Sequence, residues 1–171
     1  LWDSHFYFAS LITKMGLYRS GYRLNHISRR EHGFSQTHFG IRVLNPIRTS
    51  IEARYLANRV VMSDDNPGAI LDGLARRLSD NEVVSVTVRG DSNRPVEAGF
   101  LNGTMRIAPG AAVLAWNSGS VLLPVFTKRL DDFSYRIRIS PPLNVLENTT
   151  RRVAVASAAR EYARRLESEV I

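Results

Sequence analysis

Residues 82–130 read EVVSVTVRGDSNRPVEAGFLNGTMRIAPGAAVLAWNSGSVLLPVFTKRL and carry the clearest pattern of the chain. Two β-branched apolar runs, 83–88 and 121–127, enclose a glycine-containing polar loop and a short apolar segment at 110–117. Apolar runs bounded by turn residues are typical of strands that are buried on both faces of a parallel sheet. We therefore predict that the two runs are neighbouring strands of one sheet, with a helix over 110–117 between them.

The loop after the first run carries four charged side chains: Arg89, Asp91, Arg94 and Arg106. In open α/β sheets, ligands bind beyond the carboxyl ends of the strands, so this loop is a candidate binding site. Arg89 directly follows a strand that we expect to be buried, and burying an arginine is costly even when it is paired, which favours a functional role. Gly90 and Gly103 lie in the same loop, where glycine commonly serves turns.

The composition is that of one globular domain. With 171 residues, 44% of them hydrophobic, the chain can bury one substantial core, and we expect a single domain over 1–171. It contains no cysteine, which excludes disulfides and thiolate metal sites. Its apolar runs are far shorter than the ~20 residues that a membrane-spanning helix needs. Because it begins without methionine and its first motif lies next to residue 1, we expect an N-terminal segment to be missing.

The chain is strongly basic. Its formal net charge is +7, and Lys14 and Lys128 are its only lysines. Such a balance favours an anionic partner: nucleic acid, anionic lipid headgroups, phosphate esters or an acidic protein. Genomic base composition accounts for the preference for arginine over lysine, but not for the excess of positive charge.

Helices and strands alternate along the rest of the chain, which predicts an α/β fold with a mostly parallel central sheet flanked by helices. We expect Asp3 or Ser4 to cap a first helix that begins near residue 5, and the segment 29–48 to be a surface loop. Pro124 argues for an edge or a bulge in its strand. The remaining expected helices are at 48–58, 70–80 and from 148 or 149 to the end, and the remaining strands at 22–28, 59–62 and 135–140, the last at the sheet edge.

Several short pieces, in order and spacing, resemble those of a known enzyme superfamily. The pieces are Phe100, Gly103, Gly110-Ala111 with Leu114-Ala115, Pro124-Val125-Phe126, and Arg129. Together they resemble the lysophospholipid acyltransferase superfamily, and within it the lipid A biosynthesis (lauroyl/myristoyl) acyltransferases. The resemblance implies an acyltransferase-like fold and transfer of a fatty acyl group from acyl carrier protein or coenzyme A to a lipid hydroxyl. It implies no cofactor or metal, and a place on the cytoplasmic face of a bacterial inner membrane.

The resemblance points to His5 as the catalytic general base. In the family this histidine stands in H-x4-D or H-x4-E, where a neutral imidazole takes the proton of the acceptor hydroxyl. Here Ser10 occupies the place of the carboxylate. A serine can accept a hydrogen bond from the ring but does not stabilise an imidazolium as a carboxylate does. Asp3 or Asp91 are candidates to replace the carboxylate across space, and the alternative for His5 is a helix-capping role without chemistry.

The other histidines are weaker candidates. His26 and Glu31 also form an H-x4-E match, but His26 falls inside an alternating, strand-like segment, and chance explains the match better. His32 and His38 lie in the expected loop without the three or four converging ligands that a metal needs. We interpret both as loop residues, with substrate contact as the alternative.

The resemblance also suggests where substrates bind. Arg48, Arg54 and Arg59 lie where the superfamily places a basic residue for the acceptor's phosphate, although each can equally lie on a solvated surface. The loop with Arg89, Gly90, Asp91, Arg94, Gly103 and Arg106 resembles the block that contacts phosphate or the acyl carrier. Phe100, Met105 and Trp116 are candidates for the acyl pocket or for ordinary core.

Two other functions remain open. A protein with a decayed H-x4-D motif can bind anionic lipid through its arginines without catalysis. A nucleic-acid-binding domain is a more distant alternative, because the chain has neither finger spacing nor an aromatic–basic strand pair of the RNA-binding type, and nucleic acid is not an expected partner. If the arginines serve lipid or acyl-carrier contact, those of 29–48 and 89–106 should share one face with His5.

Overall fold

The computed structural model describes residues 1–4, 9–29, 37–62, 67–145 and 149–170. The chain divides into two compact units, Leu1–Ile12 with Val86–Ile171, and Thr13–Ser85. Helix α1 (Ala9–Arg19) and strand β4 (Val83–Thr87) each cross the boundary between the units. The expectation of a single domain stays a prediction, and each unit is described by itself.

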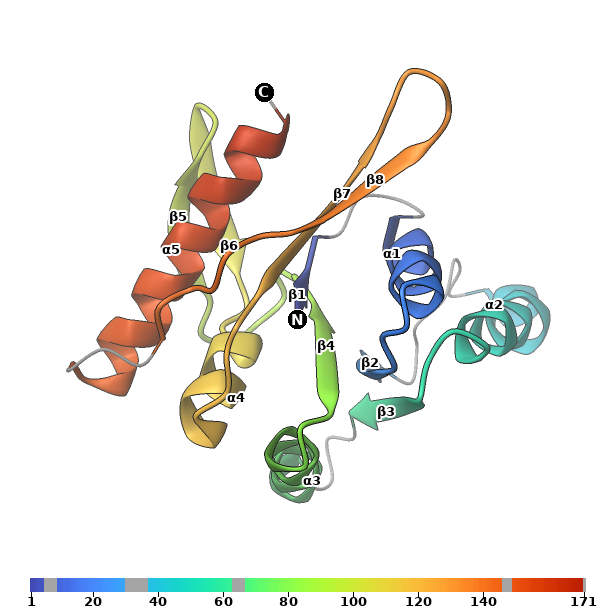
Figure 1. Cartoon of the computed structure of the whole chain (residues 1–171), viewed down its shortest axis with the longest axis horizontal. Coiled ribbons are helices and arrows are strands. Elements are labelled where there is room, and N and C mark those ends of the chain that lie inside the picture. Colours follow the sequence, from blue (N-terminus) through green and yellow to red (C-terminus); the bar gives the residue numbers. More distant parts are fainter. Residues whose placement is uncertain (5–8, 30–36, 63–66, 146–148, 171) are drawn as a thin grey trace. The chain divides into compact units, whose positions relative to one another are not determined.

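Unit Thr13–Ser85 is built from strands and helices in alternation (Figure 1). Strand β2 (Leu24–Arg29) pairs in parallel with β3 (Asn58–Met62), with Asn25 opposite Asn58 and Arg29 opposite Met62. The helices are η1 (Gly40–Leu44), α2 (Asn45–Ala53) and α3 (Pro67–Ser79). The strands 22–28 and 59–62 and the helix 70–80 expected from the sequence are thus confirmed, with small shifts of their ends.

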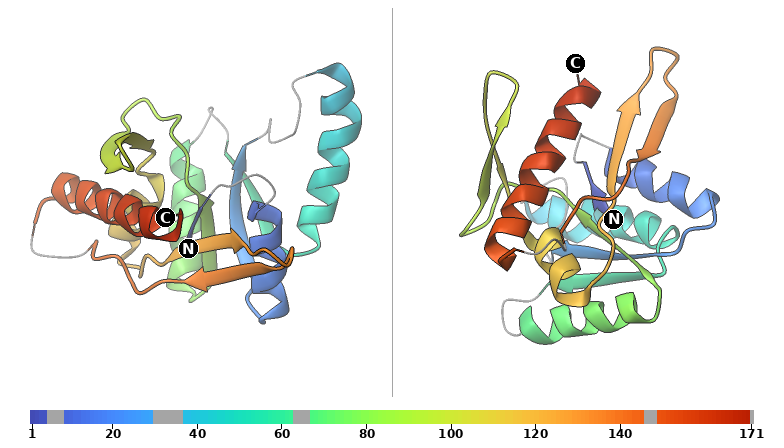
Figure 2. Two further views of the ribbon diagram at one scale, coloured as in Figure 1. Left: turned by 90° about the horizontal axis from the view of Figure 1, so that it is seen from above. Right: turned by 60° about the vertical axis from the view of Figure 1, so that its left-hand side comes forward.

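Unit Leu1–Ile12 with Val86–Ile171 is organised around a two-residue strand, β1 (Trp2–Asp3), which lies between β4 and β7 (Pro124–Arg129) and runs parallel to both. Strand β8 (Tyr135–Ile139) pairs antiparallel with β7. A separate hairpin consists of β5 (Val96–Phe100) and β6 (Gly103–Ile107). Helix α4 (Gly110–Ser118) precedes β7, and helix α5 (Arg151–Val170) follows β8. Figure 2 shows the hairpin alongside α5.

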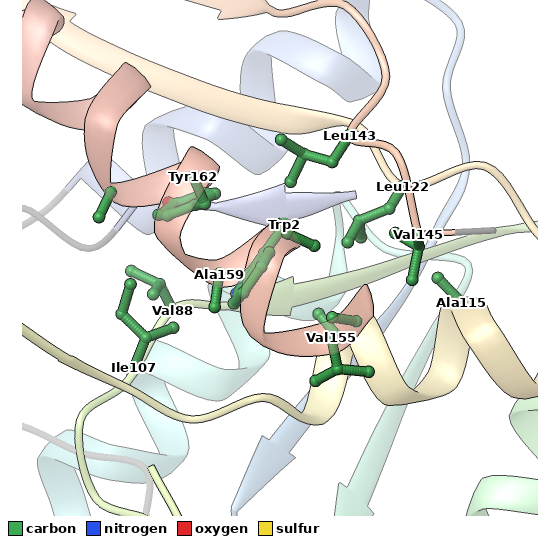
Figure 3. Close-up of a cluster of buried hydrophobic side chains, with 14 of the residues drawn as sticks. Trp2, Val88, Ile107, Ala115, Leu122, Leu143, Val145, Val155, Ala159 and Tyr162 are labelled. Carbon is green, nitrogen blue, oxygen red and sulfur yellow. The ribbon is translucent and has the colours of Figure 1, made fainter. Parts of the chain in front are cut away.

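The core of this unit is aromatic at its centre. The ring centroids of Trp2 and Tyr162 lie 4.5 Å apart, and those of Phe126 and Tyr162 lie 5.4 Å apart. Val88, Ile107 and aliphatic side chains of α4 and α5 close the cluster (Figure 3). A residue of β1 therefore joins both helices and the hairpin in one hydrophobic core.

In the unit Leu1–Ile12 with Val86–Ile171 the strand order is β4-β1-β7-β8, and in the other unit β2 lies beside β3. Of these sheet pairings, only that of the edge strand β8 is antiparallel. The α/β class with a mostly parallel sheet flanked by helices is confirmed, as are the helix over 110–117 and the edge position of 135–140. None of the described helices is long and apolar enough to cross a membrane.

Four expectations about local structure are wrong. The runs 83–88 and 121–127 belong to one sheet but are not neighbours, because β1 lies between them. Pro124 needs neither an edge nor a bulge, because it is the first residue of its strand, where proline is tolerated. The helix expected over 48–58 ends at Ala53, while the expected capping of a helix near residue 5 by Asp3 or Ser4 lies outside the described residues. The expected loop 89–109 contains the hairpin β5–β6.

The expectation of a surface loop over 29–48 is wrong from residue 38 onward. Residues 38–53 form one continuous helix in which η1 is a π-helical segment (Figure 2). Pro46 is the second residue of α2 and lies inside the continuous helix, directly after the π-helical segment η1. Proline has no backbone N–H, so the helix lacks one hydrogen bond at this position but continues through it.

Candidate active site

The candidate site lies at the carboxyl ends of β1 and β4. Asp3 pairs with Thr87 in parallel register, so both strands end at the same edge of the sheet. His5 comes two residues after β1 in the sequence, and Arg89, Gly90 and Asp91 come shortly after β4. This edge is where open α/β sheets bind ligands. His5 itself lies outside the described residues, and its catalytic role stays a prediction.

Ser4 fixes the chain directly before His5. Its amide donates to the carbonyl of Val125 at 2.9 Å, and its hydroxyl oxygen accepts a hydrogen bond from the amide of Thr127 at 3.3 Å. The preceding carbonyl, that of Asp3, accepts from the amide of Val88 at 2.8 Å. The backbone is thus held from both sides at the point where the chain leaves β1. The sequence suggested Ser4 only as a helix cap, and no pattern in it signals this role.

Asp3 is the buried carboxylate of the site. Its side chain is fully inaccessible to solvent, in the middle of the sheet. Burial raises the pKa of the Tyr162 hydroxyl well above its usual value, and the charge of Asp3 raises it further. A carboxylate two residues before His5 and shielded from water interacts strongly with nearby charge, which keeps Asp3 a candidate for the missing acid.

Asp91 is engaged by its neighbour Arg89. The Arg89 Nε and Nη2 atoms donate to the two carboxylate oxygens of Asp91, each at 2.8 Å. The side chains are 41% and 46% exposed, so the expectation that Arg89 is buried is wrong. A bidentate pair of this kind occupies both oxygens of the carboxylate. Replacement of the missing acid by Asp91 would therefore require this pair to open.

The loop after β4 packs closely on β6. The amide of Ala108 donates to the carbonyl of Arg89 at 2.6 Å. A Cβ atom at Gly90 would lie 3.1 Å from the carbonyl oxygen of Arg106, which is tighter than ordinary packing. The structure therefore brings the Arg106 backbone beside Gly90 and the Arg89 side chain beside Asp91, and the binding role expected of these residues stays a prediction.

Arg94 and Gly103 are placed differently. The backbone amide of Arg94 donates to the Ser92 hydroxyl at 3.2 Å, within a turn, and its side chain is exposed. Gly103 lies at the turn of the hairpin, opposite Phe100. The interpretation of Gly103 as a turn residue fits this position, and the binding roles of both residues stay predictions.

The remaining predicted residues lie on helices, except Arg59, which lies in β3 and donates to the Ser28 hydroxyl at 3.0 and 3.1 Å. Ser10 is buried in the first turn of α1. Arg48 is half-buried in α2, and Arg54, exposed, caps the carboxyl end of that helix. The three arginines belong to the unit Thr13–Ser85, and their contact with an acceptor phosphate stays a prediction.

The other histidines follow their non-catalytic interpretations where they are described. His26 lies buried in β2, with its Nδ1 atom 2.8 Å from the Ser85 hydroxyl. His38 is exposed at the start of the 38–53 helix rather than in a loop. Glu31 and His32 lie outside the described residues. Within the described part of the chain, no three potential metal ligands of the His, Cys, Asp or Glu type cluster.

The three candidate pocket residues belong to the core. Phe100, Met105 and Trp116 are partly buried and pack against the hydrophobic cluster of Figure 3. This placement favours the core interpretation of all three.

Comparison with known proteins identifies the family. The model of the bacterial lipid A biosynthesis acyltransferases matches residues 41–171. The match includes β4, the loop with Arg89 and Arg106, helix α4 and strand β7, and it begins after His5 and Ser10. No curated protein matches the chain. Since the matched segment covers most of the sequence, the chain belongs to the bacterial lipid A biosynthesis acyltransferase family.

Proposed function

We propose that this protein transfers a fatty acyl group from an acyl thioester to a hydroxyl of a lysophospholipid or lipid A-type acceptor. The family match over residues 41–171 carries the proposal, because it gives the reaction class. The donor is an acyl group on acyl carrier protein or coenzyme A. The site is the sheet edge at which β1 and β4 end, on the cytoplasmic face of the bacterial inner membrane.

In the proposed mechanism, His5 is the general base. Its imidazole takes the proton from the acceptor hydroxyl as the oxygen attacks the thioester carbonyl. Backbone amides stabilise the resulting oxyanion. The tetrahedral intermediate then expels the thiolate, which receives the proton from the imidazolium. The new ester and the free thiol leave, and the histidine is neutral again.

The basic residues have two tasks in this proposal. Arg89, which follows β4, and Arg106, whose backbone in β6 lies beside Gly90, contact the phosphate of the acceptor or of the acyl carrier. Arg89 does so once its pair with Asp91 opens. The net charge of +7 supports docking of an acidic acyl carrier protein, because complementary charge accelerates encounter.

An acyl-transfer assay on the full-length protein tests the proposal. We expect His5→Ala to lower kcat by roughly 10²- to 10⁴-fold, the usual contribution of a general base. His38→Ala, which changes an exposed histidine of the 38–53 helix, is the matched control and should retain activity. Wild-type turnover in His5→Ala would exclude His5 from the mechanism.

Variants of the candidate acids identify the partner of His5. If Ser10 orients the ring, Ser10→Ala lowers kcat and Ser10→Asp preserves or raises it. If Asp3 takes that role, Asp3→Asn lowers kcat while Ser10→Ala costs little. If Asp91 takes that role, Asp91→Asn lowers kcat while Ser10→Ala costs little.

The serine at position 10 favours one alternative function. A protein that has lost the acid of the H-x4-D motif can retain the fold and bind anionic lipid without catalysis. In that case the full-length protein binds lipid but shows no acyl transfer, and His5→Ala changes neither property.

A further inference from the structure

The 38–53 helix exposes an apolar surface. Phe39, Ile41 and Ile47 have 63%, 55% and 54% of their surface exposed, and Val43, Leu44 and Ile51 are also exposed. Phe39, Val43, Ile47 and Ile51 recur every four residues, which in a helix places them along one side. We call the six exposed residues the apolar face: Phe39, Val43, Leu44, Ile47 and Ile51 lie on one side, and Ile41, four residues before Asn45, lies nearer the other.

The opposite side of the same helix is polar and buried. Glu52 is 1% exposed, and its carboxylate accepts a hydrogen bond from the Nζ atom of the fully buried Lys14 of α1. Asn45 and Thr49 lie on the same side and are half-buried. Burying an ion pair costs desolvation energy, which the attraction between the charges only partly returns.

A helix on a water-exposed protein surface has the reverse arrangement, with apolar residues inward and polar residues outward. Here an ion pair faces inward and the six residues of the apolar face point outward. Contiguous exposed apolar side chains of this kind mark a surface that another apolar body covers.

The charges of the helix indicate what covers it. Its ionisable residues besides Glu52, which Lys14 neutralises, are His38, Arg42 and Arg48, and Arg54 follows at the carboxyl end. Arg42 and Arg54 are exposed. Exposed arginines beside phenylalanine, leucine and isoleucine are typical of helices that lie in the interface of an anionic membrane. An acidic protein would satisfy the arginines, but it offers little for six apolar side chains.

We propose that the 38–53 helix lies in the interface of an anionic lipid bilayer, with the apolar face among the acyl chains and Arg42 and Arg54 at the headgroups. The inference deepens the proposed function, because it names the part of the protein that contacts the membrane containing the lipid acceptor. It rests on the proposed function, because a bilayer is the expected partner only if the acceptor is a lipid.

Sedimentation with vesicles tests the proposal directly. The probe is a vesicle of phosphatidylcholine with phosphatidylglycerol, compared with phosphatidylcholine alone. We expect Phe39→Ser/Ile47→Ser to weaken binding by roughly tenfold or more, because apolar burial drives interfacial binding. Val121→Ser/Val153→Ser is the matched control, because these valines are 65% and 55% exposed, between α4 and β7 and in α5 respectively. Arg42→Gln should weaken binding to the anionic vesicles more than binding to the neutral ones.

Labelling locates the contact within the helix. The chain contains no cysteine, so a single introduced cysteine carries a polarity-sensitive fluorophore without interference. At Ile47→Cys the emission should shift to the blue when anionic vesicles are added. Ala53 is exposed six residues further along, on a different side of the helix, and a label at Ala53→Cys should shift less. Equal shifts at both positions, or none at Ile47→Cys, would overturn the proposal.

Two further outcomes also decide. Unchanged vesicle binding in Phe39→Ser/Ile47→Ser would overturn the proposal. If this variant binds vesicles normally but differs from the unmodified protein in its mass by sedimentation velocity, the apolar face contacts a second copy of the chain instead. Acyl transfer to a detergent-dispersed acceptor, measured without vesicles, keeps the two proposals apart. Loss of vesicle binding with retained transfer supports the bilayer contact, whereas vesicle binding without transfer in the unmodified protein overturns only the proposed function.

Discussion

At the scale of single residues, Gly90 shows how closely the loop beyond β4 is fitted to the hairpin. A Cβ atom there would approach the Arg106 carbonyl oxygen to 3.1 Å. This oxygen belongs to backbone that is held in place, because Arg106 pairs with Glu97 in the hairpin and the amide of Ala108 bonds to Arg89. The absence of a side chain at residue 90 therefore lets Arg89 and Asp91 lie against β6.

Gly90→Ala should consequently destabilise the protein. We expect a loss of about 1 kcal/mol in the free energy of unfolding, since the cost of forcing apart packed backbone exceeds the entropic gain of alanine. Gly73→Ala is the control, because no atom lies within 4 Å of its added Cβ in helix α3; it should stabilise by about 0.5–1 kcal/mol. Urea unfolding of both variants measures the difference. Equal stabilisation by the two substitutions would contradict the expected crowding at Gly90.

The types and approximate places of the site residues could be predicted from the sequence, but their pairings could not. Arg89, Gly90 and Asp91 follow an apolar run, which places them at a strand end. The sequence of this segment does not show that Arg89 is exposed and donates two hydrogen bonds to Asp91, because side-chain conformations in a loop depend on the space left by distant residues. The buried state of Asp3 depends likewise on strands far along the chain.

At the scale of elements, helix α5 carries a compact charge cluster. The Glu161 carboxylate accepts hydrogen bonds of 2.7 Å from Arg164 and Arg165, one turn further along. The hydrogen bond from Arg164 lowers the pKa of Glu161 to about 2, helped by Arg165 and opposed by partial burial. Pairs spaced by three and four residues support a helix locally.

Glu161→Gln should destabilise the protein only where the carboxylate is ionised. Because the folded state lowers this pKa, the stabilisation is complete above about pH 4.3, the usual pKa of glutamate, and is lost as the pH falls toward about 2. We expect a loss of at most about 1 kcal/mol at pH 7, since the pair is partly exposed. Unfolding free energies at pH 7 and pH 2.5 check this. In the background of Glu161→Gln, Arg164→Gln should have a smaller effect than it has alone, and an unchanged effect would show that the pair is not coupled.

Elements whose apolar residues face a core could be predicted, and most of those with another pattern could not. The helices α3 and α4 carry buried apolar residues such as Leu74 and Leu114. The strand β8 was predicted from its alternation although its residues are half-buried or exposed. The part 38–47 of the 38–53 helix was missed, and only 48–53 was expected to be helical, because its apolar side chains point outward and its charged partner points inward. The hairpin β5–β6 was missed because two glycines and two charged residues interrupt its short strands.

At the scale of the whole molecule, the two residues of β1 connect the most distant parts of one unit. Trp2 pairs with Val86 on one side and with Pro124 on the other, while its ring is fully buried against Tyr162 of α5. The sequence predicted the α/β class but not this strand order. A strand of two residues has no periodicity to recognise, and strand order depends on contacts between residues far apart in the chain.

Trp2→Ala should therefore cost about 3–5 kcal/mol of stability, as is typical of a large buried side chain. Trp116→Ala, which truncates a partly buried residue against the same core, should cost less. Hydrogen exchange gives a local measure, because the amides of Val86 and Val88 bond to the carbonyls of Leu1 and Asp3 and should lose protection in Trp2→Ala. If Trp2→Ala fails to fold, Trp2→Phe should show an intermediate loss. Unchanged protection of both amides would refute the central role of β1.

The position of β1 also has a consequence for the synthesis of the protein. Of the strands described, β1 leaves the ribosome first, yet its partners in β4 and β7 follow about 80 and about 120 residues later. At typical translation rates of about 5–20 residues per second, roughly 5–25 seconds pass between the synthesis of Trp2 and that of both its neighbouring strands. During that interval the Trp2 side chain, which is later buried in the core, is accessible to nascent-chain chaperones. The sheet of this unit can form only after β7 has been synthesised.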